Sequence, residues 1–113
     1  MYASGRWKGY WEQGGYGRQS MRDLQFRFGG GEVEGSGQDI VGVFTFAGTF
    51  DDSGNVVMIK QYVGAHQVLY EGRYDGEGTI HGRWSIGVWN TGSFALKPDG
   101  EEDVADWPIH SIS

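Results

Sequence analysis

Residues 23–31 read DLQFRFGGG, which is the cleanest alternation of polar and apolar side chains in the chain. Successive side chains of a strand point to opposite faces, so Leu24, Phe26 and Phe28 share one face. The three glycines that follow interrupt the alternation and predict a turn. This stretch therefore predicts a β-strand that ends in a tight connection.

Shorter versions of this pattern recur on both sides of the stretch. Before it, residues 6–13 alternate, and the glycine-rich residues 14–20 predict the longest internal loop. After it, a short strand is expected from residue 32, ended by a turn at 35–39. The remaining predicted strands are residues 40–50, 56–63, 67–74, 79–86 and 88–97. Strands at roughly ten-residue spacing with short turns form a meander, whose closure removes exposed edges. We therefore expect an all-β fold, an antiparallel up-and-down barrel of about eight strands.

The composition agrees with a small barrel. The chain has 113 residues with 21 Gly and only two Pro, and interior glycines disfavour helices. Five Trp, six Tyr and six Phe supply large buried areas and predict an aromatic core. We expect one barrel domain at residues 1–97, followed at residues 98–113 by an acidic tail that is docked or disordered.

Charge and cysteine content restrict the partners and the compartment. The net charge of −6 makes the protein acidic and disfavours nucleic acid, whose phosphates are neutralised by clustered Lys and Arg. The chain has no Cys, which agrees with a reducing, cytoplasmic location. No run approaches the ~20 apolar residues of a membrane span. A soluble protein with neither a membrane partner nor a cofactor is therefore expected.

The densest group of polar and aromatic side chains comprises Lys60, Tyr62, His66 and Tyr70, on both sides of one predicted hairpin. A three-residue turn at 63–65 would place all four on one face, with Tyr62 opposite His66. A two-residue turn would pair Tyr62 with Gln67 instead. The register of this hairpin therefore decides whether a site forms.

Three classes of function remain open. The first is a small-molecule-binding barrel with an aromatic pocket, in which aromatic area and polar groups together hold the ligand. Its candidate ligand-binding residues are Trp7, Trp11, Lys60, Tyr62, His66, Tyr70 and Trp84. The second is a protein-interaction or homodimerising domain without catalytic activity. It would use the strand at 40–50, apolar on both sides, and the face of Leu24, Phe26 and Phe28.

The third class is a small hydrolase or isomerase with His66 as general base and Lys60 or Tyr62 stabilising charge. The sequence favours binding over catalysis. No catalytic motif is present, and the three His show no spacing typical of a metal site. The acid pairs Glu32/Glu34 and Asp51/Asp52 are interpreted as solvated charges near turns.

The orientation of the face carrying Leu24, Phe26 and Phe28 is also open, because it can point inward as core or outward as an interface. If it points outward, the polar residues Asp23, Gln25 and Arg27 would line the lumen, and a polar or charged ligand would be expected.

Two resemblances bear on these expectations. Gly5-Arg6-Trp7 resembles the G-x-W that opens the barrel of calycins, the lipocalin, avidin and fatty-acid-binding families. That resemblance implies a Trp plug at one barrel end and an apolar ligand at the other. Residues 35–44, GSGQDIVGVF, and residues 60–72, KQYVGAHQVLYEG, resemble a family of small, uncharacterised bacterial domains. This second resemblance implies no function.

Overall fold

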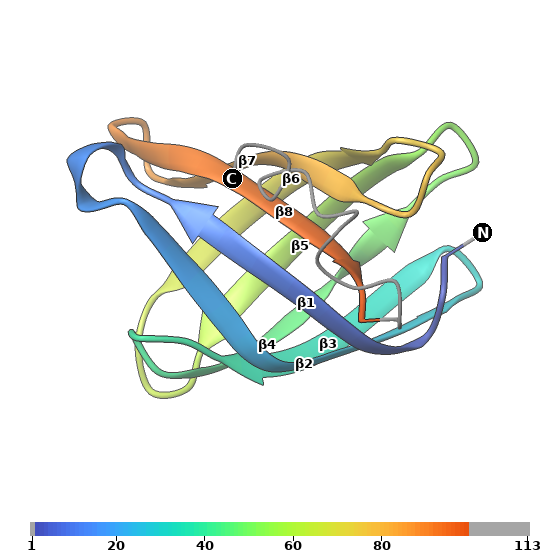
Figure 1. Ribbon diagram of the computed structural model, residues 1–113, viewed down its shortest axis with the longest axis horizontal. Coiled ribbons are helices and arrows are strands. Elements are labelled where there is room, and N and C mark those ends of the chain that lie inside the picture. Colours follow the sequence, from blue (N-terminus) through green and yellow to red (C-terminus); the bar gives the residue numbers. More distant parts are fainter. Residues whose placement is uncertain (1, 100–113) are drawn as a thin grey trace.

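The computed structural model describes residues 2–99 and shows a closed, eight-stranded antiparallel barrel, which confirms the predicted fold (Figure 1). Each strand pairs with the next along the chain, and β8 closes the barrel on β1. The strands are β1 (Gly5–Glu12), β2 (Arg18–Gly29), β3 (Glu32–Gln38), β4 (Val43–Phe50), β5 (Asn55–Tyr62), β6 (Gln67–Tyr74), β7 (Ile80–Ile86) and β8 (Asn90–Pro98). A short 3-10 turn, η1 (Gly14–Tyr16), joins β1 to β2. Within residues 2–99, no helix has the length and apolar character needed to cross a membrane.

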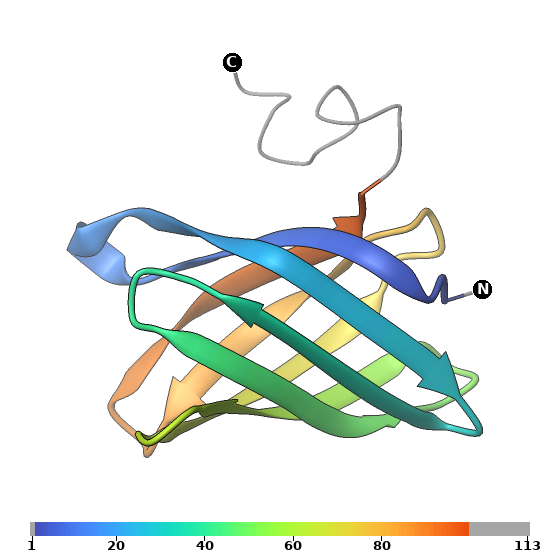
Figure 2. The same ribbon diagram turned by 90° about the horizontal axis from the view of Figure 1, so that it is seen from below.

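The barrel has two ends of different construction. The connections β1–β2, β3–β4, β5–β6 and β7–β8 lie together at one end, on the left in Figures 1 and 2, which we call the mouth. The connections β2–β3, β4–β5 and β6–β7 lie at the opposite end with the start of β1, and we call this the plugged end. The tail expected at residues 98–113 lies outside the described residues from residue 100 onward.

The alternating face of β2 points inward. Leu24 and Phe26 are buried in the core, so the lumen is apolar. Asp23 has a φ of 53° and is an extra residue in β2 between the pairs Trp7–Leu24 and Gly9–Met21. This β-bulge lets both Met21 and Leu24 face the interior although two residues separate them.

The predicted boundary between β3 and β4 is wrong. The sequence placed a turn at residues 35–39, but β3 continues to Gln38 and the turn lies at residues 39–42. Gly35 is a strand residue because aromatic rings crowd it, and a Cβ there would lie 2.6 Å from the Phe26 ring. Ile40 was expected in the strand, but it lies in the turn and is 73% exposed.

Other strand ends differ less from the predictions. The loop expected at residues 14–20 is shorter, because β2 begins at Arg18. Glycine in the strands has a packing role: Gly72 pairs with Gly82, and a Cβ on Gly82 would lie 2.0 Å from the carbonyl oxygen of Glu71. Neighbouring strands can approach this closely only where side chains are absent.

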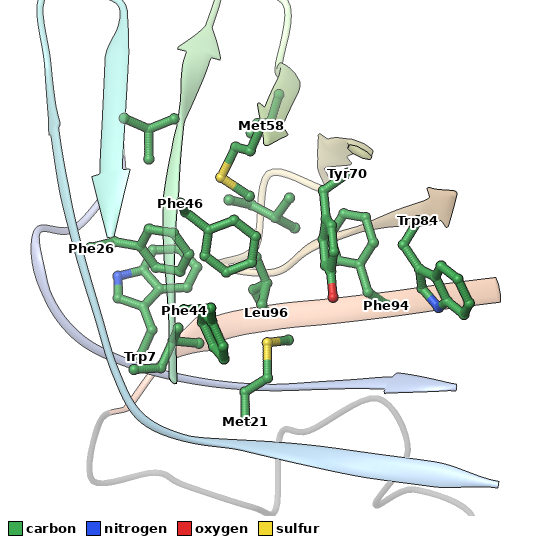
Figure 3. Close-up of a cluster of buried hydrophobic side chains, with 14 of the residues drawn as sticks. Trp7, Met21, Phe26, Phe44, Phe46, Met58, Tyr70, Trp84, Phe94 and Leu96 are labelled. Carbon is green, nitrogen blue, oxygen red and sulfur yellow. The ribbon is translucent and has the colours of Figure 1, made fainter. Parts of the chain in front are cut away.

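Aromatic rings close the plugged end. Tyr2 packs on Phe28, Phe50 and Tyr74, with ring centroids 5.0, 4.6 and 4.9 Å away. Just inside this layer, Trp7 contacts Phe26 edge to face at 5.4 Å. Figure 3 shows Trp7 beside Phe26 at one side of the core and Trp84 at the other. The interior at the plugged end is therefore filled by the protein's own side chains.

Candidate functional site

A buried carboxylate lies at the mouth. Asp39 begins the β3–β4 turn, and its side chain has no exposed area. Its Oδ1 accepts the backbone N–H of Val41 at 2.9 Å, which fixes the turn. Its Oδ2 accepts three donors: Lys60 Nζ at 2.8 Å, the Tyr62 hydroxyl at 2.8 Å and Trp11 Nε1 at 3.1 Å. One carboxylate thereby ties β1 and β5 to the β3–β4 connection.

Lys60 is the cation of this pair and is also completely buried. Besides Asp39, its Nζ donates to the Tyr70 hydroxyl at 3.1 Å and contacts the Met21 sulfur at 3.6 Å. Aromatic rings surround the ammonium, with the centroid of Phe44 at 4.2 Å and that of Tyr62 at 4.9 Å. The negative faces of such rings stabilise a desolvated cation. The surroundings of the inward face of β5 therefore accommodate a charge that a purely apolar core would exclude.

The two charges depend on each other. Burial lowers the pKa of Lys60 to about 8, although the hydrogen bond and the charge of Asp39 oppose this shift. Burial by itself raises the pKa of Asp39, but the hydrogen bond and charge of Lys60 and the Tyr62 hydroxyl outweigh it and hold that pKa below its ordinary value. At neutral pH the pair is therefore ionised and carries no net charge.

A pocket of about 160 Å³ lies at the mouth. Its lining residues come from five strands or their ends and from the β3–β4 turn. They are Trp11, Gln13, Val41, Tyr62, His66, Val68, Tyr70, Trp84, Ile86 and Asn90. Trp11 and Trp84 meet edge to face at 5.9 Å. The lining is predominantly aromatic and aliphatic, and polar groups occupy a few defined positions.

Most hydrogen-bonding groups of this lining already have partners. Trp11 donates to Asp39, and Trp84 Nε1 donates to the backbone oxygen of Glu12 at 2.9 Å. Gln13 Nε2 donates to Asn90 Oδ1 at 2.6 Å. The Tyr70 hydroxyl accepts from Lys60, and within residues 2–99 no acceptor is present for its own proton. The Tyr70 hydroxyl proton is therefore one of the lining groups without a partner in the described part of the chain.

No protein-family model and no curated protein matches this chain. The site is therefore interpreted from its own geometry.

The structure brings together five of the seven residues selected from the sequence. Trp11, Tyr62, His66, Tyr70 and Trp84 all line the pocket. The β5–β6 register is that of the three-residue turn, since the Tyr62 N–H donates to the backbone oxygen of His66 and Met58 pairs with Tyr70.

Two selected residues lie elsewhere. Lys60 does not line the pocket and instead binds Asp39 in the network described above. Trp7 lies at the plugged end, where its Nε1 donates to the backbone oxygen of Ala3 at 2.6 Å. His66 is exposed at the rim, its ring 5.1 Å from that of Tyr62, and its imidazole forms no hydrogen bond within residues 2–99. Of the two charge-stabilising residues in the enzyme hypothesis, Tyr62 lies beside His66, whereas Lys60 is held in the buried network.

Asp39 is the main functional candidate that sequence reasoning missed. The sequence places Asp39 at the end of the predicted turn at residues 35–39 and gives it no role, because acids between glycine-rich and apolar segments are usually surface residues. A usable signal was present: Asp39 lies in the segment 35–44, and Lys60 and Tyr62 lie in the segment 60–72, the two segments singled out by resemblance. In the structure these two segments meet at the Asp39 carboxylate.

The acid pairs are surface features in the structure. Glu34 forms an exposed ion pair with Arg27 on the neighbouring strand. Asp51 accepts the backbone N–H groups of Ser53 and Asn55, both at 2.9 Å, and so stabilises its own turn. Within residues 2–99, no three His, Asp or Glu side chains gather in a way that could hold a metal ion.

Proposed function

We propose that the barrel binds a small, neutral, largely apolar molecule in the mouth pocket. The observation that carries this proposal is the contrast between a core filled with aromatic rings and an unfilled pocket of about 160 Å³ beside it. Concave, mostly apolar pockets with a few placed polar groups are the usual form of small-molecule sites. A binding site gives that space a function.

Size and polarity define the class of ligand. An apolar cavity of about 150 Å³ accommodates a benzene-sized ring. A charged guest is disfavoured because it would lose its hydration above an ion pair that is already neutral overall. The Tyr70 proton can be donated to one acceptor on the guest. A single ring with one carbonyl or hydroxyl oxygen satisfies these conditions.

Native mass spectrometry of the purified protein, followed by denaturation of the same sample, tests whether a ligand is carried. A small mass that is released on denaturation supports the proposal and gives the ligand's composition.

Titration calorimetry with benzaldehyde and benzoate tests the ligand class directly. We expect benzaldehyde to bind more tightly than benzoate. Ile86→Trp should abolish binding by filling the pocket, and the matched variant Ile59→Trp, on the outer face of β5, should bind as the original protein does. Equal affinity for the two compounds, or equal effects of the two variants, would contradict the proposal.

A second candidate function is homodimerisation through the outer face of β4 and β5. The outward residues of these adjacent strands include Val43, Ala47, Val57 and Ile59, all exposed, and none of the outward residues is charged. The strands β1, β2, β3, β6 and β7 each carry an exposed charged residue or His on the outer face, and in β8 Lys97 is buried. Two copies that each carry a charge of −6 repel least when an uncharged face lies between them.

Sedimentation equilibrium over a range of protein concentrations tests this second candidate. Ile59→Lys should shift the protein to monomer, whereas Gln67→Lys, on the outer face of the neighbouring β6, should not. A monomer at all concentrations would rule the dimer out.

A further inference from the structure

Among the described residues, the large hydrophobic side chains with the highest exposure gather around the mouth. Trp89 and Val88 are 93% and 83% exposed in the β7–β8 connection. Ile40 in the β3–β4 turn is 73% exposed, and Val63 in the β5–β6 turn is 68% exposed. Three of the four connections at this end therefore present apolar side chains to solvent.

The plugged end has the opposite character. Its β4–β5 turn carries Asp51 and Asp52, and its β6–β7 turn carries Asp75 and Glu77, all exposed. Neither turn carries a large exposed hydrophobic residue. The described part of the chain is therefore polarised along the barrel axis, with acids at one end and apolar tips at the other.

The connections at the mouth are almost free of charge. Asp39 is their only acidic residue, and it is buried and paired with Lys60. His66 is the only basic side chain among them. These connections therefore present no exposed carboxylate, and Glu12 at the mouth end of β1 is paired with Arg18, although the chain as a whole is acidic.

We propose that the mouth docks on a lipid bilayer, with Trp89, Val88, Ile40 and Val63 inserted at the interface. Trp is favoured at the boundary between headgroups and acyl chains, and aliphatic tips gain by entering that boundary. The apolar residues lie on separate hairpin tips with the pocket between them, whereas a protein partner favours a continuous, closely packed patch.

Docking in this orientation places the pocket against the bilayer. Val41, in the same turn as Ile40, is both half-exposed and part of the pocket lining. A sparingly soluble ligand could then pass between bilayer and pocket with little exposure to water. The docking itself rests on the apolar tips and not on the pocket's ligand, so the two proposals can fail separately.

Flotation of the full chain with phosphatidylcholine vesicles tests the docking. We expect the protein to float with the vesicles, and Trp89→Glu to lower the partition coefficient by at least about tenfold, because a carboxylate is costly at that depth. Leu69→Glu is the matched control, since it also introduces a carboxylate at an apolar residue, here on the outer side of β6. It should float as the original protein does.

A second arm separates apolar insertion from electrostatic attraction. Adding phosphatidylglycerol should weaken binding at low salt, because the chain carries a net charge of −6, and added salt should restore it. Failure to float with any vesicle, or equal losses for Trp89→Glu and Leu69→Glu, would overturn the docking. Benzaldehyde calorimetry without vesicles reports on the pocket independently of this result.

Discussion

The two ends of the barrel are closed by different kinds of contact. At the plugged end, Tyr2 and its aromatic neighbours fill the space between the strands. At the mouth, the Asp39–Lys60 pair holds the strands together and a pocket remains beside it. The comparison shows that an interior can be kept partly open where directed polar bonds, rather than close packing alone, fix the surrounding residues.

This division has an energetic basis. The aromatic rings that close the plugged end stabilise the folded protein in proportion to the apolar area they bury. Close packing of these rings leaves no room for a guest. A buried ion pair stabilises only while both partners and their hydrogen bonds are present. Single substitutions in the Asp39–Lys60 pair should therefore lower the free energy of unfolding strongly. At the plugged end, the loss should depend on the side-chain volume removed.

The largest expected effect is that of Asp39→Ala. The change leaves the Lys60 ammonium buried without a counter-ion, and we expect the free energy of unfolding to fall by about 3–5 kcal/mol. Asp51→Ala is the matched change in a turn of the plugged end. It removes comparable bonds to backbone N–H groups from an exposed residue and should lower the free energy of unfolding much less. Urea unfolding measures both.

Combining Asp39→Ala with Lys60→Met should recover most of the lost stability, because no buried charge then remains. If the double variant is as unstable as Asp39→Ala alone, the loss comes from packing. That result would contradict the conclusion that polar bonds, rather than close packing, hold the mouth.

Phe28→Ala should have the next largest effect. Phe28 stacks with Tyr2 and contacts Phe50 at 5.5 Å, so its loss opens a cavity at the plugged end. We expect destabilisation of about 2–4 kcal/mol, less than for a fully buried Phe. Benzaldehyde affinity, measured by calorimetry, should be unchanged. A large change in affinity would show that the two ends are coupled.

The pH dependence of stability tests the pair more finely. The pKa of Lys60 is about 8 in the folded protein, below its ordinary value of 10.5, so above pH 8 the unfolded state binds more protons than the folded state. Stability should therefore rise by about 1 kcal/mol as pH increases from 8 to 9. Above pH 9 the raised pKa values of Tyr62 and Tyr70 oppose this rise, because tyrosines ionise first in the unfolded chain. Urea unfolding at several pH values should show this rise in the original protein. Lys60→Met should lack it.

The smallest expected effect is that of Tyr2→Phe. The Tyr2 hydroxyl is buried and has no hydrogen-bond partner within residues 2–99. Removing it leaves the ring stack intact, so stability should stay the same or rise by up to about 1 kcal/mol. Thermal unfolding detects the change, and a clear loss of stability would reveal a partner for this hydroxyl.

Much of the barrel was predictable because its strands follow local rules. The alternation in residues 23–28 and the turn formers at residues 51–55 mark β2 and the β4–β5 connection without reference to the rest of the chain. The β3–β4 boundary was not predictable in this way. Gly35 and Gly37 are typical of turns, yet they lie in β3 because rings from β2 and β4 cover them.

Period-two patterning and turn chemistry act over a few residues, so local sequence is enough to predict the fold class, the aromatic core and the group of residues around the β5–β6 hairpin. The burial of Asp39 against Lys60, the positions of Trp7 and Trp84 at opposite ends (Figure 3) and the gathering of apolar tips around one mouth depend on contacts that form only in the folded barrel. Barrel closure brings together residues far apart in sequence, and no local pattern records which of them meet.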